Sequence, residues 1–232
     1  KRSEENISKI LSSLGCDIGI MIYPNAQRIY LVTDEGEILD MVKGLLVVLY
    51  LLNMNASQTR KKVILPTWAP YIFKFKNLDI QRGKYSDFKA QKLKEYSLIA
   101  TVDGNFAFTE FGVFRDAIYA SLKIMEMLSF SQYKLSEISR KIDDFCYMQE
   151  KIECSQALKG KMMRKFLEDT KGKRSSSEDG VKIWENETDW ILMIPDQYSD
   201  HLNFYIQAST KEGAEALLKS YTQKIEIWSK EK

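Results

Sequence analysis

Side chains that could do chemistry are few in this sequence and lie far apart. The 232 residues include one histidine, His201, and three cysteines without CxxC spacing. A Ser–His or Cys–His nucleophile needs a base within hydrogen-bond reach, and no serine or cysteine here has an evident one. The cysteines suit neither a disulfide framework nor a zinc site, and their sparse use is typical of reduced thiols in a cytosolic protein. We therefore predict no catalytic role for His201 and a cytoplasmic location.

Two arginines stand where a phosphate group could bind. Arg28 follows a short connection between two apolar runs, and Arg115 stands beside Asp116 just before a helical pattern. Guanidinium groups bind phosphate well, but a lone arginine beside a turn is more often solvated or ion-paired. For Arg115 an ion pair or a helix cap is the simpler interpretation. A further basic helix face, predicted to be solvated, contains Lys159, Lys161, Arg164 and Lys165.

The charge balance argues against two classes of partner. Lys and Arg number 34 and Asp and Glu number 32, which gives a net charge of +2. No strong field therefore favours a nucleic acid or an anionic membrane surface. The longest apolar run, residues 44–52, has about half of the ~20 residues that a helix needs to span a bilayer. We expect neither a nucleic acid nor a membrane as a partner.

Helical and strand-like segments alternate before residue 131, which indicates an α/β layer with a mostly parallel sheet. Strands are predicted at 17–23, 28–34, 62–68 and 97–103, and helices at 4–14, 41–53, 86–96 and 114–131. The residues expected to face inward from the last of these helices are Ile118, Leu122, Met125 and Leu128. A helix followed at once by a strand at the start is typical of the last α–β unit of a domain. We therefore expect the sequence to be the C-terminal portion of a longer protein.

After residue 131 the pattern changes to that of a small α+β domain. A strand at 145–154, a helix, a loop at 171–180 and three closely spaced strands precede a final helix. The order β-α-β-β-β-α predicts helices against one face of a sheet. Ser209 and Glu212 have the spacing of a capping box, so we predict that they open the final helix.

Four stretches resemble the C-terminal part of the α-D-phosphohexomutase superfamily, which includes the phosphomannomutases and phosphoglucomutases. They are CDIGIMIYPNAQRIYLVTDEGEIL, DGNFAFTEFGVFRDAIYASLKIMEML, CSQALKGKMMRKFLED and DGVKIWENETDWILMIPDQYSDHLNFYIQA. The resemblance implies a mixed, parallel-rich α/β domain of phosphohexomutase type followed by a smaller α+β C-terminal domain. It also implies that residues 1–40 end a preceding α/β domain, that residues 41–132 form the family's third domain, and that residues 133–232 form its last.

The same resemblance indicates which chemistry is missing. The family's metal loop reads D-x-D-x-D-R, and the matching positions here are Tyr23, Asn25, Gln27 and Arg28. Mg²⁺ needs carboxylate oxygens, so the comparison implies that the family's Mg²⁺ site is lost and that this chain holds no cofactor. The sugar-recognition glutamate falls at Thr101, which cannot accept two sugar hydroxyls as a carboxylate does.

The family's phosphate loop differs as well. It reads Arg-Pro-Ser-Gly-Thr-Glu in active members, whereas residues 194–200 read Ile-Pro-Asp-Gln-Tyr-Ser-Asp. Two carboxylates would face a phosphate there, and each close unit charge would repel it by ~1–4 kcal/mol. The family's phosphoserine nucleophile lies in an upstream domain that this sequence does not contain. We predict no catalytic residue in this chain, and we predict Arg28, Thr101 and Arg115 as remnants of substrate binding.

Three functions remain open. The first is a catalytically degenerate module with a structural, oligomerisation or regulatory role, as attached to sugar nucleotidyltransferases of the mannose-1-phosphate guanylyltransferase type, in which guanylyl transfer is done elsewhere. Its expected partners are upstream domains of the same polypeptide, a second copy of the chain and, weakly, a sugar phosphate. The second is part of an active phosphomannomutase or phosphoglucomutase whose metal ligands come from Asp34, Glu35 and Asp40. The third is a binding module for a protein partner unrelated to sugars.

Overall fold

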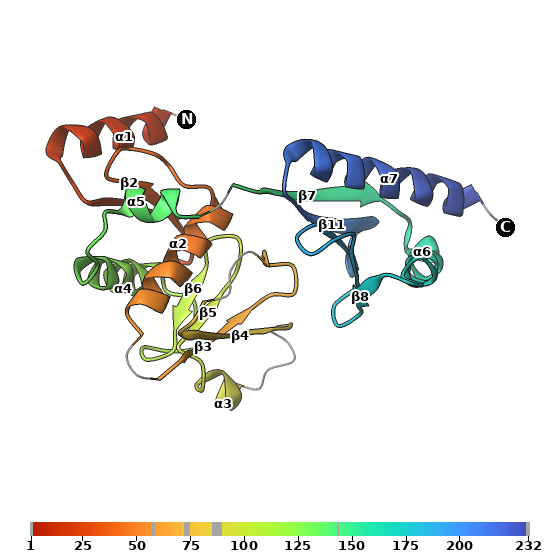
Figure 1. Ribbon diagram of the computed structural model, residues 1–232, viewed down its shortest axis with the longest axis horizontal. Helices are drawn as coiled ribbons and strands as arrows, with labels where there is room; N and C mark the ends of the chain where they lie inside the picture. The colour runs from red at the N-terminus through yellow and green to blue at the C-terminus, as the bar shows by residue number, and fades with distance from the viewer. Residues whose placement is uncertain (1, 57–58, 72–74, 85–89, 143, 231–232) are drawn as a thin grey trace. The chain divides into compact units, whose positions relative to one another are not determined.

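The computed structural model describes residues 2–56, 59–71, 75–84, 90–142 and 144–230. Its contacts divide the chain into two units (Figure 1). Unit 1 contains Lys1–Ala69 and Phe73–Asp143, and unit 2 contains Pro70–Ile72 and Asp144–Lys232. The domain boundaries predicted after residues 40 and 132 stay predictions. Within the described ranges, no helix is both long enough and apolar enough to cross a membrane.

Unit 1 begins with a helix and a two-stranded hairpin. Helix α1 (Arg2–Leu14) leads into β1 (Ile18–Ile22), which pairs antiparallel with β2 (Ile29–Thr33). Both strands are rich in β-branched residues, which fit a pleated, half-buried surface. Ile22 pairs with Ile29, so residues 23–28 form the connection between the strands. This hairpin confirms the two strands and the short connection that the sequence predicts.

A four-stranded mixed sheet follows, in the order β4-β3-β5-β6. Its strands are β3 (Lys61–Leu65), β4 (Leu78–Arg82), β5 (Leu98–Ala100) and β6 (Phe106–Phe108). Strand β3 runs parallel to both β4 and β5, and β6 returns antiparallel to β5. This parallel-rich arrangement confirms the predicted fold class. The sequence does not predict β4, because this edge strand buries only Leu78 and is otherwise partly or fully exposed.

Three helices of unit 1 lie together, and α2 contacts both of the others (Figure 1). They are α2 (Met41–Met54), α4 (Ala117–Ser129) and α5 (Leu135–Arg140). Asp40 caps α2 by accepting a hydrogen bond from the backbone N–H of Lys43 at 2.8 Å. Of the helix predicted at 86–96, the structure describes one turn, α3 (Ala90–Leu93), and residues 86–89 lie outside the described residues.

Helix α4 buries a different face from the one that the sequence predicts. Ile118 and Leu122 are 59% and 58% exposed, and Met125 is 40% exposed, whereas Leu128 is buried as expected. The buried residues of this helix are Ala117, Ala120, Ser121, Ile124, Met127 and Leu128. Apolar residues occupy two faces of α4, and the face with small side chains packs inward because it lets neighbouring elements approach closely. A helical period alone does not distinguish two apolar faces.

Unit 2 is a five-stranded antiparallel sheet with two helices. Its elements are β7 (Cys146–Glu153), α6 (Gln156–Asp169), β8 (Arg174–Ser176), β9 (Val181–Trp184), β10 (Trp190–Pro195), β11 (His201–Ala208) and α7 (Lys211–Lys230). The strand order is β7-β11-β10-β9-β8. Strand β8 lies in the segment 171–180 that the sequence predicts as a loop, because its residues Arg-Ser-Ser carry no apolar pattern.

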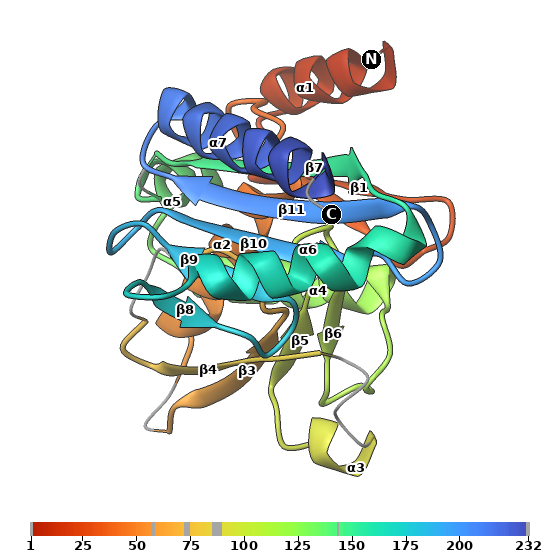
Figure 2. The same ribbon diagram turned by 90° about the vertical axis from the view of Figure 1, so that its right-hand side faces the viewer.

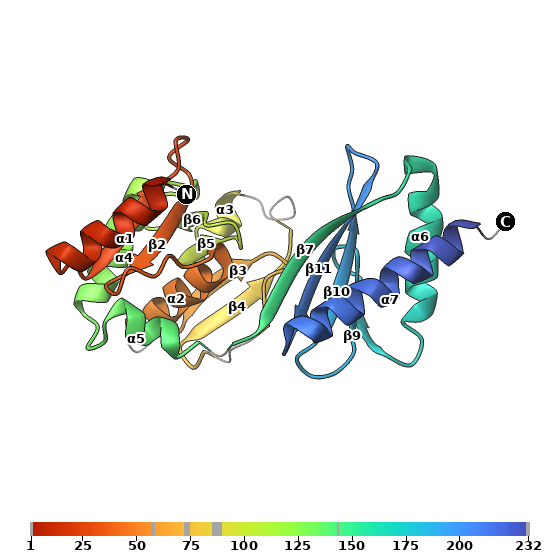
Figure 3. The ribbon, with the colours of Figure 1, turned by 90° about the horizontal axis from the view of Figure 1, so that it is seen from above.

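Helices α6 and α7 cover the same face of this sheet (Figures 2 and 3). Phe166 of α6 stacks on Tyr221 of α7, with ring centroids 5.2 Å apart, and Phe204 of β11 lies 5.8 Å from Phe166. All three side chains are buried. The α+β arrangement with helices on one face is therefore as predicted, with one additional strand.

The predicted capping box at the start of α7 is wrong by one residue. Thr210, not Ser209, accepts the capping hydrogen bond, from the backbone N–H of Gly213 at 3.1 Å. Ser209 instead donates its hydroxyl to Asp189 at 2.9 Å. Two neighbouring residues of capping type precede the helix, so composition alone does not select between them.

In the core of unit 2, the side chain of Tyr221 makes a polar contact that joins three segments. The buried Tyr221 hydroxyl of α7 lies 3.1 Å from a carboxylate oxygen of Asp169 in α6 and 3.0 Å from one of Glu185 after β9. Burial and the two carboxylates raise the pKa of Tyr221 well above its usual range. The phenol therefore stays a hydrogen-bond donor and links α7 to both segments.

The connection between β5 and β6 turns through Gly104, which has a φ of 77°. A Cβ built there would lie 2.6 Å from the backbone oxygen of Ile29 and 2.6 Å from the Met41 sulfur. The positive φ and the close approach both require glycine at this position.

We expect Gly104→Ala to lower the free energy of unfolding by about 2–4 kcal/mol, because the left-handed backbone and the clash both oppose a side chain. Gly15→Ala is the matched control in unit 1: its φ is 64°, but a Cβ there meets no atom within 4 Å. The control should lose about 1–2 kcal/mol, from backbone strain alone. Urea denaturation of both variants measures the difference, and equal losses would contradict the packing described for Gly104.

Replacing Tyr221 by phenylalanine should lower the free energy of unfolding by about 1–2 kcal/mol, because the two carboxylates lose a buried donor. Tyr198→Phe removes the same hydroxyl from a side chain that is 95% exposed, so it should leave stability unchanged. Thermal and urea unfolding of the two variants measure this difference. An unchanged midpoint in the Tyr221 variant would show that the hydroxyl does not hold α7 in place.

Candidate functional site

Two loops of unit 1 come together in the structure. Loop 23–28 connects β1 to β2, and loop 101–105 connects β5 to β6. The backbone N–H of Ile29 donates to the oxygen of Gly104 at 3.0 Å, and Arg28 pairs with Asn105 in an isolated antiparallel bridge. The fold thus places Arg28 and Thr101, two of the three residues predicted as binding remnants, on adjoining loops.

The Asp103 carboxylate is the centre of this pair of loops. Its Oδ2 lies 3.0 Å from Nη2 of Arg28, and its Oδ1 accepts the Thr101 hydroxyl. The buried Asn105 side chain donates to the same hydroxyl oxygen at 3.2 Å. Arg28 and Asp103 form an ion pair, so the positive charge of the Arg28 guanidinium is neutralised by a carboxylate of the same chain.

Arg115, the third predicted residue, precedes α4 and is exposed. Its neighbour Asp116 caps the helix, with Oδ1 accepting from the backbone N–H of Tyr119 at 2.8 Å. The helix start reaches loop 23–28, because the backbone N–H of Ala117 donates to the oxygen of Ala26 at 2.9 Å. All three predicted residues therefore lie on segments that contact one another.

Loop 23–28 itself offers no acidic oxygen to a metal ion. The Oδ1 of Asn25 accepts a hydrogen bond from the backbone N–H of Gln27 at 3.2 Å, and the ring of Tyr23 lies 6.1 Å from that of Tyr30. Among the residues that the structure describes, no three His, Cys, Asp or Glu side chains are grouped closely enough to hold a metal ion. A phenol and two neutral amides do not fit the donor set that Mg²⁺ requires.

The carboxylates considered as replacement ligands have other partners. Asp34 accepts from the backbone N–H and the hydroxyl of Ser136 at 2.9 and 3.1 Å, and Glu35 pairs with Arg140 at 2.7 Å. Asp40 is the cap of α2. Each of the three therefore already stabilises a local contact of unit 1.

In unit 2, loop 195–200 is held by its own side chains. Oδ1 of Asp196 accepts the backbone N–H groups of Tyr198 and Ser199, each at 2.9 Å. These hydrogen bonds hold the pKa of Asp196 far below its usual range. Asp200 accepts the backbone N–H of Gln156 at 3.0 Å, at the first residue of α6. Both carboxylates point to backbone donors of the chain.

Lys159 lies beneath this loop and contradicts the prediction of a fully solvated basic face on α6. It is only 6% exposed, and its ammonium donates to the backbone oxygens of Asp196, at 2.6 Å, and Ser199. The sequence contains a signal for this burial: Lys159 precedes the buried Met162 and Phe166 by three and seven residues and so shares their helix face.

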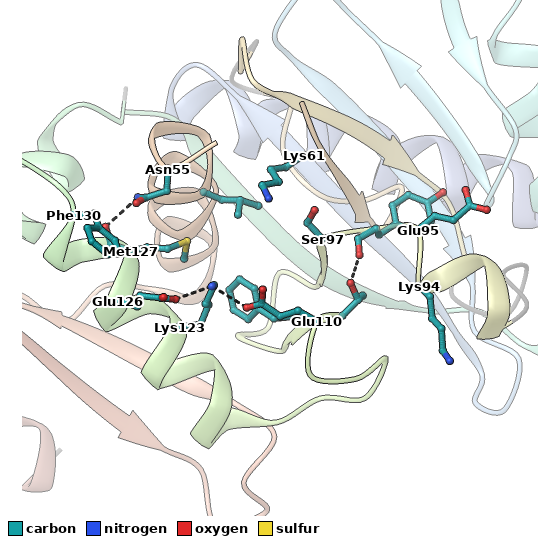
Figure 4. A pocket seen from close by; sticks show the side chains of 14 residues that line it. Asn55, Lys61, Lys94, Glu95, Ser97, Glu110, Lys123, Glu126, Met127 and Phe130 are labelled. Atoms are coloured by element: carbon teal, nitrogen blue, oxygen red, sulfur yellow. Dashed lines mark hydrogen bonds and ion pairs between the residues drawn. The ribbon is translucent and has the colours of Figure 1, made fainter. Parts of the chain in front are cut away.

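A pocket of about 490 Å³ lies elsewhere in unit 1 (Figure 4). Ser97, which precedes β5, lines it, whereas loop 101–105 follows β5, so the pocket lies at the opposite end of that strand. Figure 4 shows Lys123 between Glu110 and Glu126. Its Nζ lies 2.9 Å from Oε1 of Glu110 and 2.6 Å from Oε2 of Glu126. Burial would raise the pKa of Glu110, but the hydrogen bonds from Lys123 and Tyr119 outweigh it and lower the pKa.

The charged lining residues of this pocket are Lys61, Lys94, Lys123, Glu95, Glu110 and Glu126. The signs balance, so the lining carries no net charge that would attract a charged ligand. Sequence reasoning missed this pocket, because its residues come from helix ends and strand ends that are distant in the chain.

No protein-family model matches the sequence. A Pyrococcus furiosus protein named a probable phosphoglucosamine mutase is 27% identical over 231 residues, covering 94% of this chain and 50% of that protein. A Methanococcus maripaludis phosphoglucosamine mutase is 33% identical over 108 residues, covering 45% of this chain and 24% of that protein. The chain spans about half the length of the curated relatives that match it almost throughout.

The fold also matches a solved structure. A phosphoglucomutase/phosphomannomutase family protein of Burkholderia thailandensis superposes with a TM-score of 0.75 at 13% identity, and the match covers 99% of this chain and 50% of that one. The chain therefore has the fold of the α-D-phosphohexomutases, and it has phosphoglucosamine mutases among its homologues.

Proposed function

We propose that this chain is a phosphohexomutase-type region that does not itself transfer a phosphoryl group and serves as a structural, oligomerisation or regulatory module. The proposal rests on the side chains of loop 23–28 and their contacts. It presents no carboxylate, and its one cation, Arg28, is paired with Asp103. A phosphoryl-transfer site needs a fixed divalent cation or equivalent positive charge at the transferring group, and this loop supplies neither.

The exposed face of α4 supports a role in packing. Ile118, Leu122 and Met125 form an apolar stripe on that helix, and all three are at least 40% exposed. Such a stripe is typical of a surface that another protein segment covers. The proposed partners are upstream domains of the same polypeptide or a second copy of this chain, with no nucleic acid and no membrane. A weak sugar-phosphate contact through Arg28, Thr101 and Arg115 is part of the same proposal.

The identity of the whole protein is a separate proposal. Attachment to a mannose-1-phosphate guanylyltransferase-type nucleotidyltransferase, in the cytoplasm, is one version of it. A second candidate is that the parent protein is a working phosphohexomutase, and the names of the relatives favour it, because they are called phosphoglucosamine mutases. In that version the ligands of the metal ion would come from residues outside loop 23–28.

Calorimetric titration tests the primary proposal. We expect neither Mg²⁺ alone nor Mg²⁺ with mannose 1-phosphate or glucosamine 1-phosphate to bind with a Kd below about 1 mM, because the loop lacks acidic ligands. Metal-dependent binding of a sugar phosphate in the micromolar range would overturn the proposal. A coupled mutase assay on the full-length parent protein separates the module from the second candidate.

Restoring the acidic residues provides the positive arm of this experiment. The triple variant Tyr23→Asp, Asn25→Asp, Gln27→Asp should bind Mg²⁺ or Mn²⁺ at least about tenfold more tightly than the starting protein, because three carboxylates would share one loop. The matched control is Tyr23→Asn with Gln27→Asn, which shortens the same side chains without adding charge. Equal affinities in the acidic and amide variants would show that missing carboxylates are not what prevents metal binding.

A further inference from the structure

The pocket of about 490 Å³ in unit 1 has the size and composition of a small-molecule site. Ligand pockets in proteins commonly enclose about 300–1,000 Å³ and combine an apolar lining with a few polar groups. Lys61 begins β3 and Phe108 ends β6, so the pocket lies at the sheet edge opposite to loop 101–105. The side chains of Leu52, Phe108 and Met127 are buried and give the pocket an apolar wall.

One side of the pocket carries two carboxylates and a single ammonium, and so has a net negative charge. Lys123 pairs with Oε1 of Glu110 and with Oε2 of Glu126. The hydroxyl of Tyr119 donates to the same Oε1 of Glu110, at 2.8 Å. These contacts involve one oxygen of each carboxylate, and an ionised carboxylate can accept at both of its oxygens. The second oxygens of Glu110 and Glu126 can therefore accept hydrogen bonds from an incoming ammonium.

Lys61 supplies a positive charge on the opposite side of the drawn pocket (Figure 4). Glu95 of the lining pairs with Lys62 at 3.7 Å, and Lys123 binds the other two carboxylates, so no ion pair of Lys61 occurs among the described residues. Burial raises the pKa of Glu110, hydrogen bonds lower it, and the charge of Lys61 adds to the lowering. A half-buried ammonium without an ion pair favours an anionic group as its partner.

We propose that this pocket binds a small zwitterion that carries a carboxylate at one end, an ammonium at the other and an apolar chain between them. The carboxylate pairs with Lys61, the ammonium pairs with Glu110 and Glu126, and the chain packs against the apolar wall. The lining contains three lysines and three glutamates, so a zwitterion keeps the pocket neutral, whereas a phosphate dianion would leave it with unbalanced charge. The inference goes beyond the proposed function, because the pocket shares no residue with loop 23–28 and needs no metal ion.

A set of four compounds tests the need for two separated charges. The probe is 6-aminohexanoate, which has both charged groups at the ends of an apolar chain. Hexanoate and hexylamine each keep a six-carbon chain with one charge, and leucine has both charges beside a single carbon, so these three are the matched controls. Each is titrated against the full chain at constant ionic strength without metal, and the amide signals of Ser97 and Thr109 are followed by nuclear magnetic resonance. We expect a Kd on the order of 1 mM for the probe and at least about tenfold weaker binding of the controls.

Three variants test the two charged sides of the pocket. Lys61→Gln should weaken binding of 6-aminohexanoate at least about tenfold, because the carboxylate loses its partner. Lys62→Gln is the matched control and should leave the Kd unchanged, since Lys62 is the next residue of β3 but does not line the pocket. Glu126→Gln, at a half-exposed position, should weaken 6-aminohexanoate about threefold or more without weakening hexanoate. It also provides the test if Lys61→Gln does not fold.

Three results would overturn the inference. If 6-aminohexanoate at about 20 mM shifts neither amide signal in the folded protein, the pocket does not bind this class of ligand. If hexanoate, hexylamine or leucine binds as tightly, the pocket does not require two separated charges. If Lys62→Gln loses as much affinity as Lys61→Gln, the effect comes from surface charge in general. None of these results bears on the metal and sugar-phosphate titrations of loop 23–28, because the pocket and that loop have no residue in common.

Discussion

Asp103 is the residue on which the candidate site depends, because its carboxylate holds Arg28 and Thr101 at once. The contact exists only because the hairpin of β1 and β2 and the hairpin of β5 and β6 bring their connections together. Arg28 and Asp103 are about two-fifths exposed, and exposed pairs of this kind contribute roughly 0–1 kcal/mol. An incoming anion could therefore displace Asp103 at little cost.

A carboxylate plays a similar part in unit 2. In loop 101–105 a carboxylate neutralises a guanidinium, and in loop 195–200 a carboxylate occupies backbone donors. Asp200 adds a third case, since it accepts the first N–H of α6, where a helix dipole favours negative charge. In each case a group that could have met an anion meets a side chain of the same chain. The polar groups of these loops therefore stabilise local structure.

The sequence predicted a helix or strand correctly where its apolar pattern and its length indicated the same type of element. The hairpin at 18–33, the buried helix α2 and the strands β9, β10 and β11 all carry continuous or alternating apolar runs. The predictions failed where polar residues form a strand, or where two faces of one helix are both apolar and only one is buried. Strand β8 has no apolar residue to reveal it, and α4 offers two apolar faces of which the one with small residues is buried.

The sites were predictable only in part, for a physical reason. Matching loop positions to a known pattern located Arg28 and Thr101, because such a comparison works along the chain. Their common partner Asp103 depends on contact across the fold, which no local pattern contains. Lys159 is the instructive failure: it was predicted to be solvated, although its spacing from Met162 and Phe166 places it on the buried face of α6. A charged residue on an apolar face should therefore prompt a search for a polar loop above it.

Similarity to phosphoglucosamine mutases does not by itself restore their chemistry to this chain. Fold and ancestry are carried by many core positions, whereas the chemistry depends on a few loop side chains. A segment outside this sequence could supply a nucleophile, but a divalent ion next to loop 23–28 would also need acidic oxygens nearby. The carboxylates considered as replacement ligands, Asp34, Glu35 and Asp40, hold Ser136, Arg140 and the start of α2. Recruiting them as metal ligands would break three contacts of unit 1, so these carboxylates stabilise the fold of unit 1.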